Sequence, residues 1–216
     1  LVHEMGFTKF ALITNSNAYG TGERATFKQF LEENNLKPVA DEVVDPNAKD
    51  FTAQLSKIKA SNPEVLYVGT EDIQMGLIVK QAKALGIEAQ ISGGNSMATS
   101  VFVETAGAEA AEGSIFATTY ISKDVSEQAR TFAEKYKEKY GEYPDNHGAK
   151  AYDGMNMLIE AMRNAHPNID GPSIREEILK LDYQGVTGHF KFDETGEGMD
   201  QLTMGIIRNG KAEVLE

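Results

Sequence analysis

The sequence contains no cysteine, which excludes a disulfide framework, a thiolate zinc site and a cysteine nucleophile. Basic residues are also scarce, because 21 lysines and arginines stand against 33 aspartates and glutamates, for a formal net charge of -12. A surface of this sign repels a phosphate backbone, and the basic residues do not cluster, so we expect no nucleic-acid partner. With 216 residues, the chain is long enough for one large domain or two small ones.

Long hydrophobic runs are missing as well. The apolar stretches are only a few residues long, as at residues 10–13, whereas a membrane-spanning helix needs about 20. No basic segment followed by an apolar one indicates a signal peptide in this chain. Leu1, Val2 and Met5 followed by Gly6 have the pattern of a last helical turn with its closing glycine. We therefore interpret the chain as a fragment with sequence missing upstream.

Strands and helices alternate over the first 120 residues. Apolar runs predict strands at residues 10–14, 39–44, 65–68, 90–92 and 114–118. A loop is expected at residues 15–22, and amphipathic patterns predict helices at residues 23–33, from Asp50 to about 58, at 73–85 and at 101–106. This alternation predicts an α/β fold, a doubly wound parallel sheet with helices on both faces.

The organisation changes after Tyr120. Three helices are expected, at about residues 125–140, from Pro144 to about 165 and after Pro172, with almost no strand between them. Glycine-punctuated segments close the chain at residues 185–193, 194–196, 202–208 and 212–215. Three helices cannot form a doubly wound layer alone, so we expect them to cover a sheet supplied from elsewhere, most simply by the missing upstream segment.

One segment is a candidate nucleotide-binding motif. Residues 20–25 read G-x-G-x-x-A, and Asp41 and Glu42 follow about where a ribose-binding acid would be expected. However, five residues separate Thr14 from Gly20, and Tyr19 would sit where a pyrophosphate needs bare backbone. We therefore favour a glycine-containing loop before a helix and expect no cofactor.

Metal-binding and catalytic motifs are weak. The four histidines are dispersed, at His3, His147, His166 and His189. Asp193, Thr195 and Glu197 faintly match a calcium loop, but its twelfth position is Met204 rather than glutamate, so we favour a hairpin turn. No G-x-S-x-G motif is present. We predict neither a metal site nor catalytic residues, and enzyme chemistry has no support.

Polar and aromatic residues follow three of the expected strands. In an open parallel sheet, ligands bind outside the carboxyl ends of the strands. These residues are Asn15, Ser16, Asn17 and Tyr19 after the first strand, Thr70, Glu71 and Asp72 after the third, and Asn95 and Ser96 after the fourth. Each alone could be a helix cap. Their convergence on one edge of the sheet predicts a ligand-binding crevice.

Short motifs follow one another in a fixed order along nearly the whole chain. They are NAYGTG at 17–22, DFT at 50–52, PEVLYVG at 63–69, QAKALG at 81–86, AEG at 111–113, YGEYP at 140–144, AYD at 151–153, GVTG at 185–188 and FDETG at 192–196. In this order they resemble the branched-chain amino acid type of periplasmic binding protein, whose members bind leucine, isoleucine or valine and have a type I fold of two lobes.

This resemblance implies a domain organisation. Residues 7–119 with 202–216 would form one nearly complete lobe, and residues 122–198 the helical part of a second. The hinge segments would lie near residues 120–123 and 198–202. The implied function is that of the solute-binding receptor of an ABC importer, which captures an amino acid or related small polar solute by hinge closure and delivers it to a membrane permease. The implied location is periplasmic or extracellular, with a signal peptide and an optional lipid anchor in the precursor.

Two other functions stay open. The same fold serves as the extracellular ligand-sensing domain of signalling receptors, and a nucleotide-dependent α/β enzyme is a third, less favoured class.

The resemblance also implies roles for individual residues. Tyr19 matches the aromatic residue that covers the ligand, and His147 falls at a position usually held by an aromatic side chain. Glu71 falls where many members place another aromatic residue, and Asn95 where amino-acid-binding members often place an acid for the ligand's ammonium. The predicted ligand-binding residues are Tyr19, Asn17, Glu71, Asp72, Asn95 and His147.

These departures leave two kinds of ligand open. A buried ammonium needs a counter-charge, so with an amino acid as ligand we expect Glu71 or Asp72 to replace the acid lacking at Asn95. The alternative is a carboxylate or aromatic acid without an ammonium, for which His147 could donate a hydrogen bond.

A fragment would also leave apolar helix faces uncovered, such as Phe132 with Tyr136, and Met155 with Leu158 and Met162. Large exposed apolar patches seldom persist on a monomer. We therefore expect the truncated chain to self-associate through residues 125–180, or this region to rearrange.

Overall fold

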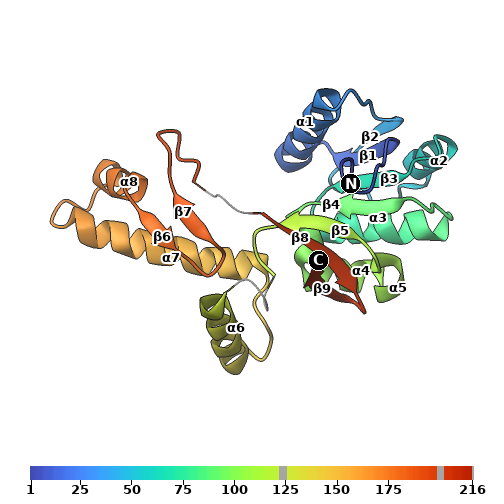
Figure 1. The fold of residues 1–216 in the computed structure, drawn as a ribbon. Coiled ribbons are helices and arrows are strands. Elements are labelled where there is room, and N and C mark those ends of the chain that lie inside the picture. The colour runs from blue at the N-terminus through green and yellow to red at the C-terminus, as the bar shows by residue number, and fades with distance from the viewer. Residues whose placement is uncertain (122–125, 199–201, 216) are drawn as a thin grey trace. The chain divides into compact units, whose positions relative to one another are not determined.

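The computed structural model describes residues 1–121, 126–198 and 202–215. The chain divides into two compact units, each considered by itself (Figure 1). We call Leu1–Ala117 with Met204–Glu216 the sheet unit, and Thr118–Thr203 the helical unit. Of the expected hinge segments, residues 122–123 and 199–201 lie outside the described residues. None of the described helices is long and apolar enough to cross a membrane.

The sheet unit is built on a seven-stranded sheet in the order β2-β1-β3-β4-β5-β8-β9. The strands are β1 (Phe10–Asn15), β2 (Ala40–Val44), β3 (Val65–Gly69), β4 (Gln90–Gly93), β5 (Ile115–Thr118), β8 (Thr203–Arg208) and β9 (Lys211–Val214). The neighbours from β2 to β5 pair in parallel, and β8 pairs with β9 antiparallel. The predicted α/β class with a mostly parallel central sheet is confirmed.

Helices alternate with these strands and cover the sheet (Figure 1). They are α1 (Ala18–Glu33), α2 (Thr52–Ala60), α3 (Asp72–Ala84), the 3-10 helix η1 (Asn95–Ala98), α4 (Ser100–Ala106) and α5 (Ala108–Ala111). Phe10, Leu12, Val65 and Tyr67 pack with Leu31 of α1. The residues between them on β1 and β3 face the opposite side and are also buried, which is why these strands read as continuous apolar runs.

The prediction of a loop at residues 15–22 is wrong, because α1 begins at Ala18 rather than at Glu23. Asn17 caps this helix, and its Oδ1 accepts a hydrogen bond from the Gly20 amide at 3.0 Å. A Cβ on Gly20 would overlap the side chain and backbone of Asn15 at the end of β1. Gly20 therefore lets the helix start close to the strand, and it is not part of a flexible loop.

The helical unit consists of three helices and one hairpin in its described part. The helices are α6 (Glu127–Tyr140), α7 (Asn146–Ala165) and α8 (Gly171–Leu179), and the hairpin pairs β6 (Asp182–Gln184) with β7 (His189–Lys191) antiparallel. Each helix starts at a capping side chain, Ser126, Asp145 or Asp170. The fully buried Asp153 of α7 accepts hydrogen bonds from the backbone amides of Val186 and Thr187, at 2.9 and 2.7 Å, and so fastens the β6–β7 turn to the helix.

Residues 1–7 form one hydrogen-bonded turn. The Gly6 amide donates to the Val2 carbonyl at 3.1 Å, and the Phe7 amide donates to the Leu1 carbonyl at 3.2 Å. Gly6 has a φ of 71°, in the left-handed region that glycine adopts at the end of a helical turn. The sequence pattern at this position predicted this local geometry.

Candidate ligand-binding site

The candidate site lies at the carboxyl edge of the parallel strands in the sheet unit. β1 has β2 on one side and β3 on the other, so the strand order reverses at β1. Ligands in open α/β sheets bind where the order reverses, outside the carboxyl ends of the strands. The segments that follow β1, β3 and β4 hold five of the six predicted ligand-binding residues: Asn17, Tyr19, Glu71, Asp72 and Asn95.

Glu71 connects two of these segments. Its carboxylate accepts hydrogen bonds from the side-chain amides of Asn15, the last residue of β1, and Asn17, although Glu71 itself precedes α3. Asn15 is almost fully buried, and its Nδ2 also donates to Gln74 Oε1 at 3.1 Å. The Glu71 side chain makes no cap bond to α3, so it is positioned across the edge of the sheet rather than along its own helix.

The charge of Glu71 is not neutralised by an ion pair within the described residues. A carboxylate has about four lone-pair sites, and the two amides occupy only two of them. The residue is exposed, so a ligand can reach its carboxylate. This arrangement can accept hydrogen bonds from a cationic donor.

Tyr19 lies on the first turn of α1, with its hydroxyl against η1. Oη is buried and makes no hydrogen bond of normal geometry with the described residues. A Cβ on Gly94 would stand 3.2 Å from this oxygen and 3.3 Å from Glu23 Oε2. Burial raises the pKa of Tyr19 to about 12, and the Glu23 and Glu71 carboxylates add to the shift. The phenol therefore stays protonated at neutral pH and can donate a hydrogen bond.

Asn95 and Asp72 differ in whether their side-chain oxygens are free to bind a ligand. Asn95 is the first residue of η1, and its Oδ1 is buried without a partner in the described part of the chain. The Oδ1 of Asp72 accepts from the amide of Ile73 at 3.0 Å, so this carboxylate serves the start of α3. Of the two acids expected to face an ammonium, Glu71 is the one placed among the other candidates.

His147 lies in the helical unit, on the first turn of α7, and is exposed. Its neighbour Asn146 is buried and accepts a hydrogen bond from Thr119 Oγ1 at 2.9 Å. The role expected for His147 stays a prediction.

Glu23 is a residue that the sequence reasoning did not propose for the site. Its carboxylate accepts a hydrogen bond from Tyr67 Oη and lies beside Tyr19. The sequence feature that could have identified Glu23 is its four-residue spacing from Tyr19, which places both side chains on one face of a helix. Because the helix was expected to begin at Glu23, that spacing could not be used.

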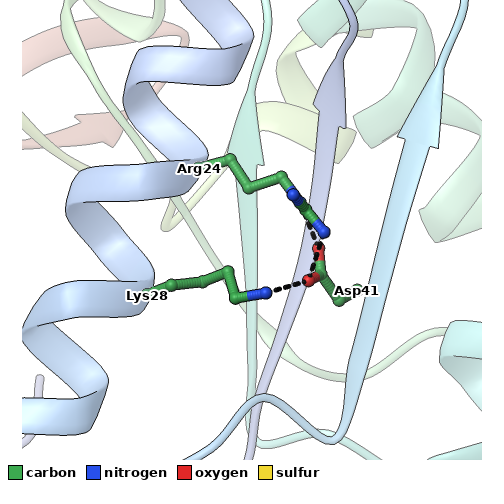
Figure 2. A network of polar contacts seen from close by, with 3 residues as sticks. All are labelled: Arg24, Lys28 and Asp41. Atoms are coloured by element: carbon green, nitrogen blue, oxygen red, sulfur yellow. Dashed lines mark hydrogen bonds and ion pairs between the residues drawn. The ribbon is translucent and has the colours of Figure 1, made fainter.

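The nucleotide-binding motif is not formed. Its glycines lie inside α1, and Asp41 is engaged by Arg24, whose Nε and Nη2 stand 2.7 Å from the two carboxylate oxygens, and by Lys28 Nζ at 2.9 Å (Figure 2). Burial by itself would raise the pKa of Asp41, but the hydrogen bonds from Arg24 and Lys28 outweigh it and hold the pKa below its usual value. Glu42 pairs with Lys57 at 3.0 Å. Ion pairs thus engage both acids that a ribose would need.

The calcium-like segment is a local turn. Asp193 Oδ1 accepts hydrogen bonds from the amides of Thr195, Gly196 and Glu197, at 2.8 to 3.1 Å. No group of three or more potential metal ligands occurs among the described residues.

Comparisons with known proteins identify relatives of this chain. Residues 1–212 match the periplasmic binding protein family. A leucine-, isoleucine-, valine-, threonine- and alanine-binding protein of Pseudomonas aeruginosa is 25% identical over 187 residues, which cover 87% of this chain and 49% of that relative. The chain therefore spans about half the length of this curated relative.

Two solved structures have the same fold as this chain. A leucine-binding protein from Thermotoga maritima superposes with a TM-score of 0.91 at 29% identity, covering 100% of this chain and 61% of that one. A branched-chain amino acid transporter substrate-binding protein from Streptococcus pneumoniae, in complex with isoleucine, gives 0.87 at 30% identity, covering 99% and 62%. With the family match over almost its whole length, the chain belongs to the periplasmic binding protein family.

Proposed function

We propose that the chain carries the ligand-binding part of a solute receptor that serves an ABC importer, and that its ligand is an amino acid or a related small polar solute. The observation that carries this proposal is the Glu71 carboxylate, held by two amides at the reversal point of the sheet and within electrostatic range of Tyr19. The names of the relatives support the same class of ligand. The proposed role is binding without catalysis, with a membrane permease as partner.

In this proposal the two units belong to the two lobes of the receptor. Residues 7–119 with 202–216 act as one lobe, residues 122–198 belong to the other, and the hinges lie near residues 120–123 and 198–202. Ligand bound on one lobe would favour closure of the other over it. A shift from 1:99 to 99:1 in favour of the closed form takes about 5.5 kcal/mol of preferential binding. The proposed location is periplasmic or extracellular, with an optional lipid anchor.

Glu71 is proposed to receive the ligand's ammonium. An ammonium has three N–H donors and a full charge, and burying it without a counter-charge costs several kcal/mol. Glu71 supplies the charge, and the unpartnered Oδ1 of Asn95 supplies an acceptor for one of the donors. Tyr19 can cover the ligand with its ring and donate from its hydroxyl.

The test is a titration of the ¹⁵N-labelled 216-residue chain with a panel of amino acids and organic acids, followed by NMR, which detects dissociation constants up to about millimolar, or roughly 4 kcal/mol of binding. We expect amino acids to shift the amide resonances around Tyr19, Glu71 and Asn95. Glu71→Gln should weaken binding about tenfold or more, since it removes the charge from a hydrogen-bonded ion pair.

The matched control is Glu104→Gln, which removes one charge from the exposed face of α4. It should leave the affinity unchanged. Unchanged affinity in Glu71→Gln would remove the proposed role of Glu71. Tighter binding of organic acids than of amino acids would favour the alternative ligand class.

We also propose that this chain self-associates through residues 125–180. Aromatic rings form a series on the helical unit: Phe132 to Tyr152 at 4.6 Å, and Tyr136 to Tyr140 at 4.6 Å between ring centres. These rings line a groove of about 1000 Å³. Tyr140 and Met155 are 58% and 57% exposed, so a second copy could bury apolar surface there.

A further inference from the structure

Glu23 is an acid on an otherwise aromatic face of α1. It is half-buried between Tyr19, four residues before it, and Phe27, four residues after it. Phe27 stacks on Tyr67 with ring centres 4.0 Å apart, and the Tyr67 hydroxyl donates to Glu23 Oε2. A carboxylate in such surroundings loses hydration, and one phenol does not neutralise its charge. The residues that the structure describes show no ion pair to Glu23.

Three of the donors near this edge are already in use. The amides of Asn15 and Asn17 donate to Glu71, and the Tyr67 hydroxyl donates to Glu23. The two nearby basic residues of α1, Arg24 and Lys28, are paired with Asp41 (Figure 2). Beside the Tyr19 hydroxyl, which can donate, the acceptors that remain are further lone pairs of the two carboxylates and the buried Oδ1 of Asn95.

The two carboxylates act on the same point of the site. Both Glu23 and Glu71 raise the pKa of the Tyr19 phenol, after the larger effect of its burial. The hydroxyl of Tyr19 thus lies within electrostatic range of both. A ligand with one ammonium would neutralise one of these charges and leave the other in a partly desolvated place.

We propose that this edge selects a solute with two positively charged groups, one on Glu71 and a second ammonium or guanidinium beside Glu23. This inference rests on the proposed function and assigns Glu23 as the specificity-determining residue. A ligand with an uncharged side chain of the same length would leave Glu23 without a counter-charge, so it should bind more weakly.

The test compares L-lysine with L-norleucine, which has a side chain of similar length without the ammonium. Both are titrated into the ¹⁵N-labelled 216-residue chain, and dissociation constants are taken from the amide shifts of residues 15–23 and 94–96. We expect lysine to bind about tenfold tighter, and Glu23→Gln to bring the two affinities close together by weakening lysine alone. Glu32→Gln, an exposed acid on the same helix, should preserve the preference.

Two further measurements separate the charge of Glu23 from its structural bond. Tyr67→Phe removes the hydrogen bond and keeps the carboxylate, so the preference for lysine should remain. In the native chain, added salt should weaken lysine more steeply than norleucine, a result that does not depend on any variant folding.

The possible failures are distinguishable. Norleucine binding as tightly as lysine, or an unchanged ratio in Glu23→Gln, would overturn this inference and leave the proposed function standing. If neither ligand shifts the resonances at the edge, this inference fails, and the titration with the panel of amino acids and organic acids decides the proposed function separately.

Discussion

At the scale of single residues, the pairing of charges decides which acids are free to bind a ligand. Asp41 and Glu42 stand beside Arg24, Lys28 and Lys57 and are engaged in ion pairs. Glu71 and Glu23 are bound by neutral amides and a phenol, which leave their charge in place. Asp41, which a search for the nucleotide-binding motif would select, is thus unsuitable for binding a ligand. Glu23, which such a search would ignore, has a carboxylate without an ion pair among the described residues.

The ion pairs of Asp41 should stabilise the fold. Asp41→Asn removes two pairs at a site that is only 18% exposed, and we expect it to lower the free energy of unfolding by about 1 kcal/mol. Glu42→Gln, whose partner Lys57 is 67% exposed, should cost less than about 0.5 kcal/mol. Urea unfolding at neutral pH measures both changes.

The pH dependence follows from the depressed pKa of Asp41. Its stabilising effect is fully present above the unfolded pKa of about 3.9 and is lost as the pH falls through the lower folded pKa. The difference between the native chain and Asp41→Asn should therefore shrink as the solution is acidified below about pH 4. A difference that grows under acid would contradict this assignment.

At the scale of elements, the start of α1 determines the shape of the candidate site. A helix that begins at Ala18 places Tyr19 and Glu23 on one face, whereas a loop over residues 15–22 would have left Tyr19 free of the helix. Gly20 allows this start, because any larger residue would meet Asn15.

Two glycines in the first turns of α1, Gly20 and Gly22, allow a matched pair of alanine variants that tests where the helix starts. Gly22 has no atom within 4 Å of its would-be Cβ, so Gly22→Ala should stabilise the chain by about 0.5 to 1 kcal/mol through helix propensity. Gly20→Ala should destabilise it by about 1 to 3 kcal/mol, since the methyl group overlaps Asn15. Thermal unfolding of both variants checks the pair, and equal effects would show that the helix start is placed wrongly.

At the scale of the whole molecule, the two units differ in how well they bury apolar residues. The sheet unit covers both faces of its sheet, with β1 and β3 almost wholly buried. In the helical unit, the aromatic groove of α6 and α7 and the exposed Met155 are uncovered. This contrast is the basis of the proposed self-association.

The self-association is tested by sedimentation velocity. We expect a concentration-dependent mixture of species for the native chain and mostly monomer for the double variant Tyr152→Lys and Met155→Lys, because two charges oppose burial of the groove. Ile73→Lys changes a side chain of 59% exposure in the sheet unit and should not alter the distribution. A native chain that stays monomeric at all concentrations would refute the proposal.

The sequence by itself determined the α/β class and the order of most strands and helices, but not η1, α5 or β6. Residues 10–13 and 65–68 are apolar without interruption because both faces of a parallel strand are buried, and that requirement is local enough to read from composition. The helix ends at Gly86 and Gly141 were likewise predictable, because glycine is the usual residue where a helix closes in the left-handed conformation. Both glycines have a positive φ in the structure.

Only the tertiary structure decided the pairing of Asp41 with Arg24 and Lys28 and the joining of Glu71 to Asn15 and Asn17. The physical reason is distance along the chain: Glu71 lies 56 and 54 residues from the two amides that hold it. Local sequence propensity cannot predict contacts between residues so far apart in the chain. They arise when parallel strands bring their carboxyl ends to one edge, so the candidates could be named from the sequence, but the charge each presents to a ligand could not.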